Sequence, residues 1–185
     1  MSKYRINTNY AKALYMLAEE TGSTERVEAD MRLVGSVFAE NRQLAALFAN
    51  PTMPQAKKMA VLADLFDSRV CDATRLFLRF VVRKNRAVSL GQISEAYLDL
   101  YRQANGIVLG ELVTHQPVDD AMRDRMSSLV SAYTGRAVEL RERTDANMLG
   151  GFKLEFDGKM YDARIRTKIR KMRLAFANNE YESKL

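Results

Sequence analysis

The chain has 185 residues, of which 47% are apolar and 28% are charged, as in an ordinary globular protein with a packed core. A single cysteine and a single histidine exclude an internal disulfide and a cysteine–histidine zinc site. The net charge of +6 is compatible with a partner that carries phosphate groups, such as RNA or an anionic membrane. The longest apolar runs, such as residues 76–82, are far shorter than the roughly 18 apolar residues that span a bilayer, so no span is predicted.

Residues 4–105 carry apolar side chains at helical spacing in six successive segments. The breaks between the segments are short and contain glycine, asparagine or proline, which commonly end or begin helices. Because short loops bring consecutive helices into contact, this pattern predicts a compact bundle of six helices.

Two of these predicted helices carry most of the information about binding. The first is expected to bury a face formed by Tyr10, Leu14, Leu17 and Ala18. Asn7 or Thr8 is expected to cap its start. In the fifth helix, residues 76–82 are apolar on nearly every side, which indicates either the centre of the bundle or a helix that also offers a face to a partner.

After Gly106 the spacing of the apolar residues changes. β-Branched and alternating runs predict three strands, at residues 107–115, 137–143 and 152–156. Asp157 and Gly158 tolerate the positive φ angles of a tight hairpin turn, so a fourth strand is expected to follow them. The helix between the first two strands is expected to start at the acidic pair Asp119 and Asp120. Its predicted buried face consists of Met122, Met126, Leu129 and Tyr133.

The last segment, residues 163–173, contains six arginine and lysine residues and is expected to be helical. Its predicted buried stripe consists of Ile165, Ile169, Met172 and Phe176. The fold class is therefore α+β overall: an N-terminal six-helix bundle, residues 1–106, followed by a small α/β C-terminal domain with a mixed sheet, residues 107–185. The boundary between the two domains is predicted only from the change in the spacing of the apolar residues.

The glycine pair Gly150–Gly151 could either cradle a phosphate or let the chain bend. It leads into a strand, whereas phosphate-binding glycine loops lead into a helix, so a structural bend is favoured. His115 could act as a base oriented by Asp119 or Asp120, but no nucleophile motif accompanies it. No catalytic, cofactor-binding or metal site is therefore predicted, and Cys71 is expected to be a packing residue.

The basic last helix leaves one alternative function, an RNA-binding module. Recognition of single-stranded RNA normally combines basic residues with exposed aromatic side chains. Phe152, Phe156 and Phe176 are expected to be core residues, so this alternative is weaker than helix-mediated binding to protein partners.

Four segments in the same order resemble the delta subunit of F-type ATP synthase, the bacterial counterpart of the mitochondrial oligomycin-sensitivity-conferring protein. They are "YAKALYMLAEE" near the start, "NPTMPQAKKMAVLADLF" at 50–66, "FLRFVVRKNRAVSLGQISEAYLDLYRQANG" at 77–106 and "DANMLGGFKLEFDGKMYDARIRTKIRKMRLAF" at 145–176. The resemblance covers nearly the whole chain.

The resemblance implies a non-catalytic stator subunit without a cofactor. Its N-terminal helical bundle would bind N-terminal helices of alpha subunits in a groove between the first and fifth helices. Its C-terminal domain would bind the peripheral-stalk b subunits, and no specific nucleic acid is expected. One copy per complex is expected. Since no targeting segment precedes the match, a peripheral protein at the cytoplasmic face of a bacterial plasma membrane is expected.

The resemblance also implies, by position, a partner-binding surface on the first and fifth helices. Seven residues carry this expectation: Tyr10, Ala13, Leu14, Leu17, Phe77, Phe80 and Val81. Each of them could instead belong to the core of the bundle, because apolar side chains serve both purposes.

Overall fold

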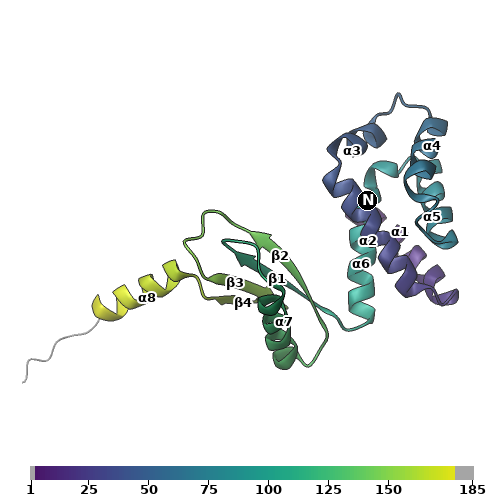
Figure 1. Ribbon diagram of the computed structural model, residues 1–185. Coiled ribbons are helices and arrows are strands. Elements are labelled where there is room, and N and C mark those ends of the chain that lie inside the picture. The colour runs from purple at the N-terminus through teal and green to yellow at the C-terminus, as the bar shows by residue number, and fades with distance from the viewer. Residues whose placement is uncertain (1–2, 178–185) are drawn as a thin grey trace, which may run out of the picture. The chain divides into compact units, whose positions relative to one another are not determined.

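The computed structural model describes residues 3–177 (Figure 1). The chain divides into two compact units, Met1–Asn105 and Gly106–Leu185. The first unit is helical and the second combines helices with a mixed four-stranded sheet, so the predicted α+β class is confirmed. None of the helices within residues 3–177 is both long and apolar enough to cross a membrane.

The first unit is built from helices joined by short loops. Its elements are α1 (Lys3–Glu20), α2 (Thr24–Glu40), α3 (Arg42–Ala49), α4 (Gln55–Phe66), α5 (Asp72–Arg83), the single 3₁₀ turn η1 (Ala87–Ser89) and α6 (Leu90–Ala104). α6 packs along α1 and α2 and forms the centre of the unit. Tyr97 of α6 is fully buried there, and burial raises the pKa of its hydroxyl.

The buried face of α1 differs from the prediction. Asn7, Ala11, Leu14 and Ala18 point into the core, at spacings of four, three and four residues. Tyr10 and Leu17 lie beside this face and are not enclosed. The helix also begins at Lys3, before the two predicted caps. Asn7 is therefore inside the helix, where its side-chain amide donates a 2.7 Å hydrogen bond to Gln92 of α6.

A buried carboxylate fixes the start of α5. Asp30 of α2 accepts a hydrogen bond of 2.8 Å from the backbone N–H of Cys71, the residue before α5. Arg26 lies one helical turn away, 3.5 Å from the same carboxylate. Asp30 thereby satisfies a backbone donor at the start of α5 that has no partner within the helix. Cys71 is half-buried, in keeping with a packing role.

The second unit has a two-layer arrangement. Its elements are β1 (Val108–Thr114), α7 (Asp120–Thr134), β2 (Val138–Thr144), β3 (Phe152–Phe156), β4 (Lys159–Asp162) and α8 (Ile165–Ala177). The strand order is β2-β1-β3-β4, with β1 parallel to β2 and the other two pairs antiparallel. Side chains from one face of the sheet and from α7 form a small core of Val108, Leu112, Val130, Leu154 and Phe156.

Local signals set the ends of these elements as predicted. The Asp119 carboxylate accepts a 2.8 Å hydrogen bond from the backbone N–H of Met122 and caps α7. Gly135 ends α7 in the left-handed conformation, with φ of 68°. Asp157 and Gly158 have φ angles of 48° and 70°, as the tight turn between β3 and β4 requires.

The predicted buried faces of α7 and α8 are partly or wholly wrong. On α7, Val130 is buried whereas Leu129 and Tyr133 are exposed, so the buried face lies to one side of the predicted one. On α8 all four residues of the predicted buried stripe are exposed, and Phe176, expected in the core, is 74% exposed. In Figure 1, α7 lies against the sheet and α8 continues beyond the end of β4.

Candidate partner-binding surfaces

The glycine pair serves the backbone and does not form an anion site. Gly150 and Gly151 have φ angles of 132° and 81°, which side-chain-bearing residues rarely adopt. A Cβ atom on Gly151 would lie 2.3 Å from the carbonyl oxygen of Ala163. The Gly150 carbonyl accepts a hydrogen bond from the backbone N–H of Ile165. The pair therefore brings the start of β3 against the start of α8, which is the structural alternative raised from the sequence.

His115 is exposed at the end of β1 and has no supporting constellation. The Asp119 carboxylate is used to cap α7, and Asp120 forms an ion pair with Arg123 of the same helix. Both candidate orienting groups thus stabilise a helix start. Within residues 3–177, no group of three or more histidine, cysteine, aspartate or glutamate side chains is placed to hold a metal ion.

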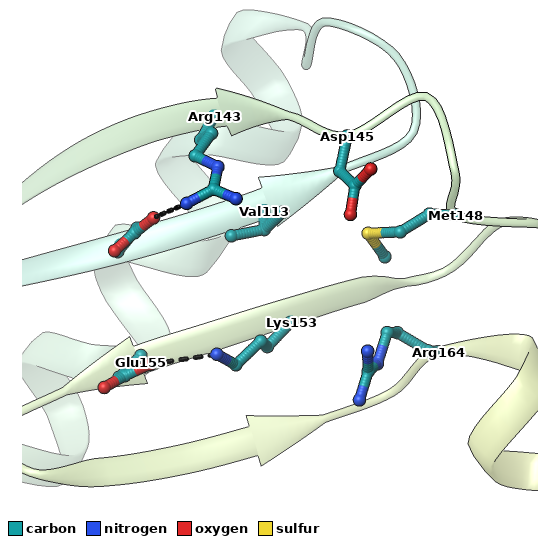
Figure 2. A pocket seen from close by; sticks show the side chains of 8 residues that line it. Val113, Arg143, Asp145, Met148, Lys153, Glu155 and Arg164 are labelled. Atoms are coloured by element: carbon teal, nitrogen blue, oxygen red, sulfur yellow. Dashed lines mark hydrogen bonds and ion pairs between the residues drawn. The ribbon is translucent and has the colours of Figure 1, made fainter.

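The sheet face opposite α7 carries a polar hollow of about 350 Å³ (Figure 2). Arg143 lies 3.6 Å from Glu111, and Lys153 lies 3.0 Å from Glu155. Arg164 also lines this hollow, and its guanidinium is held by Asp162. Because these cations are paired with carboxylates of the same unit, the hollow does not concentrate one sign of charge and is a poor site for an anionic ligand.

The pairing of Asp162 with Arg164 also fixes the start of α8. The Asp162 carboxylate accepts hydrogen bonds from the Arg164 side chain at 2.6 and 3.0 Å, from the Arg164 backbone N–H, and from the Thr167 hydroxyl. The hydrogen bonds from the Arg164 guanidinium hold the pKa of Asp162 well below its usual range.

The structure divides the seven residues expected on the binding surface into two groups. Leu14, Phe77 and Val81 are buried in the core of the bundle. The other four are partly or largely exposed on the outer side of α1 and α5: Tyr10, Ala13, Leu17 and Phe80. The buried three support this outer face from below and do not line it.

The outer face joins two helices that are distant in sequence. The rings of Tyr10 on α1 and Phe80 on α5 are in tilted contact, with centroids 6.1 Å apart. Leu17 is 40% exposed and Phe80 is 43% exposed. The Lys84 ammonium lies 5.6 Å from the centre of the Phe80 ring and gives this apolar face a basic edge.

Comparison with known proteins identifies the chain. The profile of the ATP synthase delta (OSCP) subunit matches residues 6–176. The chain is 35% identical to ATP synthase subunit delta of Cytophaga hutchinsonii over 176 residues, covering 95% of this chain and 96% of that protein. It is 31% identical to ATP synthase subunit delta of Salinibacter ruber over 169 residues, covering 91% and 89%.

The chain belongs to the ATP synthase delta (OSCP) family. A chain in the structure of the Toxoplasma gondii mitochondrial ATP synthase hexamer has the same fold, with a TM-score of 0.70 at 17% identity. That likeness covers 92% of this chain and 97% of the other. As a member of the delta (OSCP) family, the chain is a non-catalytic, peripheral-stalk subunit of F-type ATP synthase, and so a peripheral part of a membrane-bound complex.

One exposed apolar residue of α5 was not among the seven residues predicted for the partner-binding surface. Leu76 of α5 is 62% exposed and lies one helical turn before Phe80, on the same side of the helix. The spacing in the sequence could have indicated Leu76, because it is four residues from Phe80 and so lies on the same side of the helix. The buried residues Phe77 and Val81 have the same spacing. Leu78 and Val82 form a third pair with this spacing, also buried, so the spacing alone does not show which pair faces outward.

Proposed function

We propose that this chain links the alpha/beta catalytic hexamer to the peripheral-stalk b subunits. The first unit binds N-terminal helices of alpha subunits, and the second unit binds the C-terminal ends of the b subunits. By holding the catalytic head against rotation, the chain couples proton-driven rotation to ATP synthesis. One copy acts in each complex, at the cytoplasmic face of a bacterial plasma membrane.

The outer face of α1 and α5 is the observation that carries this proposal. Five apolar side chains from the two helices are exposed or half-exposed there: Tyr10, Ala13, Leu17, Leu76 and Phe80. Clustered apolar side chains on adjoining helices are typical of a groove that receives the apolar face of a third helix. The buried side chains beneath them keep the two helices together, so this apolar face is formed before the partner arrives.

Such a groove suits a connector that works under torque. Slippage is resisted by slow dissociation, which depends mainly on a few well-packed anchor side chains. Phe80 and Leu17 are the best anchors, because each still exposes much of its apolar side chain. Completing their burial stabilises a complex by roughly 1 kcal/mol or more per side chain.

Calorimetry with the full chain and a peptide that copies the N-terminus of the cognate alpha subunit tests the first unit's role. We expect micromolar or tighter binding, and about tenfold weaker binding for Phe80→Ala or Leu17→Ala. Val88→Ala is the matched control, because Val88 is an exposed apolar residue of the same unit outside α1 and α5. Absent binding at micromolar concentration, or equal losses in all three variants, contradicts the proposed groove.

The RNA-binding alternative gains no support from the arrangement of side chains. Among the described residues of α8, Phe176 alone is aromatic, whereas recognition of single strands uses several aromatic side chains on a platform. A salt-dependent gel shift with mixed-sequence RNA separates the two functions. The stator function predicts only weak retention that disappears at physiological salt.

A further inference from the structure

α8 presents a narrow apolar stripe that stays exposed among residues 106–177 of its own unit. Ile165, Ile169, Met172 and Phe176 recur at spacings of four, three and four residues, and all four are exposed. At about 100° per residue they span about 60° of the helix circumference. A helix that packs on a globular core uses a stripe of roughly 100° or more, and the narrower stripe is typical of a coiled-coil seam.

Basic side chains border this stripe on both sides. If the four apolar residues occupy the seam positions of a heptad, Arg166 and Arg173 flank the seam on one side and Lys168 flanks it on the other. α8 contains five basic residues and no acidic residue in Ile165–Ala177. Flanking positions select coiled-coil partners by charge, so this helix prefers a partner that is acidic beside its own seam.

The surface at the start of α8 is concave. A hollow of about 590 Å³ lies between the loop residue Leu149 and the first turns of the helix. Leu149 is 77% exposed and lines this hollow together with Ile169 of the stripe. The wall of the hollow is otherwise basic, with Arg166, Arg170 and Arg173 among its residues. A flat membrane surface would leave such a hollow unfilled, whereas a side chain of a partner helix can enter it.

We propose that α8 and Leu149 form one side of a heteromeric two-helix seam, whose other side is an amphipathic helix with acidic residues flanking its apolar positions. This inference rests on the proposed function, which supplies the C-terminal segment of a b subunit as the source of that helix. The acidic residues that flank the partner's seam make its binding to α8 specific, and the apolar contacts along the seam supply most of the affinity.

The same features disfavour the other occupants of the stripe. A second copy of this chain would bring Arg166, Lys168 and Arg173 against identical cations, and like charges at flanking positions oppose pairing. A helix that lies on a membrane surface normally has a wide apolar face. The stripe of α8 is narrow, and its hollow next to Leu149 would stay unfilled on a flat surface.

Binding of a peptide that copies the C-terminal segment of the cognate b subunit to the full chain tests the inference. The variants are the charge reversal Arg166→Glu with Arg173→Glu, and Ile169→Asp in the seam. Lys171→Glu is the matched control, because Lys171 lies on the same helix away from the stripe. All of these side chains are exposed, so circular dichroism should show an unchanged fold. A designed helix with glutamate at its flanking positions, and its lysine counterpart, serve as probes independent of the b subunit.

We expect roughly tenfold weaker binding of the b peptide for the charge reversal, more than roughly 30-fold weaker binding for Ile169→Asp, and a change within about twofold for Lys171→Glu. Added salt should weaken binding to the native chain and should not weaken binding to the charge-reversed chain. The glutamate probe should bind and the lysine probe should not.

The remaining outcomes distinguish a failure of the seam from a failure of the proposed stator function. Binding of the b peptide that none of the α8 variants changes overturns the seam and leaves the stator function standing. Failure of the b peptide to bind the native chain, with the glutamate probe still bound through Ile169, supports the seam and contradicts the b subunit as its partner. The seam is also overturned by self-association in sedimentation that Ile169→Asp abolishes. Binding to phosphatidylglycerol vesicles or RNA at physiological salt, through α8 and in place of both peptides, overturns it as well.

Discussion

Replacing Gly151 by alanine should destabilise the second unit far more than replacing another glycine with positive φ. Gly151 has φ of 81°, and a Cβ atom there would lie 2.3 Å from the Ala163 carbonyl oxygen and 3.0 Å from the Arg164 Cα. Both neighbours are backbone atoms, so no side chain can rotate away to make room. Gly135 has φ of 68° and nothing within 4 Å of the corresponding position, which makes Gly135→Ala the matched control.

The two substitutions share one energetic term and differ in another. An L-residue in the left-handed region costs about 1 kcal/mol, and this cost applies to both glycines. Gly151→Ala must in addition displace the backbone between β4 and α8, as overpacking does at a cost of about 1–3 kcal/mol. We therefore expect a loss of about 1 kcal/mol for Gly135→Ala and about 2–4 kcal/mol for Gly151→Ala.

Amide hydrogen exchange of the full chain measures this difference within each unit. A loss of about 3 kcal/mol corresponds to more than roughly 100-fold faster exchange in β1 and β3. The amides of α6, in the other unit, should keep their protection and act as an internal reference. If Gly151→Ala accelerates exchange no more than Gly135→Ala does, the close approach of Gly151 to Ala163 is not a constraint on the fold, and the reasoning is refuted.

Two further predictions concern buried or strongly hydrogen-bonded carboxylates. Asp30→Ala should destabilise the first unit by about 1–3 kcal/mol in urea denaturation because the Cys71 N–H loses its acceptor, whereas Asp30→Asn, which keeps an acceptor oxygen, should lose less. The pKa of Asp162 is lowered in the folded chain, so the stability that it contributes is fully present above the ordinary aspartate pKa of about 3.9 and is lost as the pH falls below that value. Exchange protection at the start of α8 should accordingly stay constant from pH 7 to about pH 5 and decrease below about pH 4, and Asp162→Asn should remove this pH dependence.

Much of this fold follows from signals that act within a few residues. Asp119 caps α7 because its carboxylate reaches a backbone N–H three residues on, and Asp157–Gly158 turns the chain because both residues tolerate positive φ. These causes are local, so the sequence suffices to predict them. The second unit begins at Gly106, whereas the change of period placed its start at residue 107.

The direction in which each apolar face points could not be predicted in this way. In α5, Phe77 and Val81 are buried whereas Leu76 and Phe80 are exposed, although all four are apolar and equally spaced. The choice depends on the helices that pack against α5, namely the preceding α4 and the more distant α1 and α2. The residues predicted to form the binding surface are therefore a mixture of exposed and core residues.

The error at α8 has a different physical cause. An apolar stripe such as Ile165, Ile169, Met172 and Phe176 predicts that the helix packs on another apolar surface. The sheet of the same unit is the surface nearest in sequence. The inner face of the sheet is already covered by α7, and the outer face is polar, with Glu111, Arg143, Lys153 and Glu155 along its strands. Neither face of the sheet is thus left as an apolar surface for α8, which agrees with the proposal that another chain covers the stripe.

The two proposed binding surfaces place different demands on their partners. The outer face of α1 and α5 rests on a complete core, so its shape does not depend on occupancy. α8 has 13 residues, close to the limit of about 12–15 below which an isolated helix is marginal in water, and beyond its first turn its apolar side chains are exposed. A partner helix that covers the stripe therefore also stabilises α8 itself. Since a partner that binds only the folded helix stabilises it by mass action, this part of the stability of α8 would depend on the partner being bound.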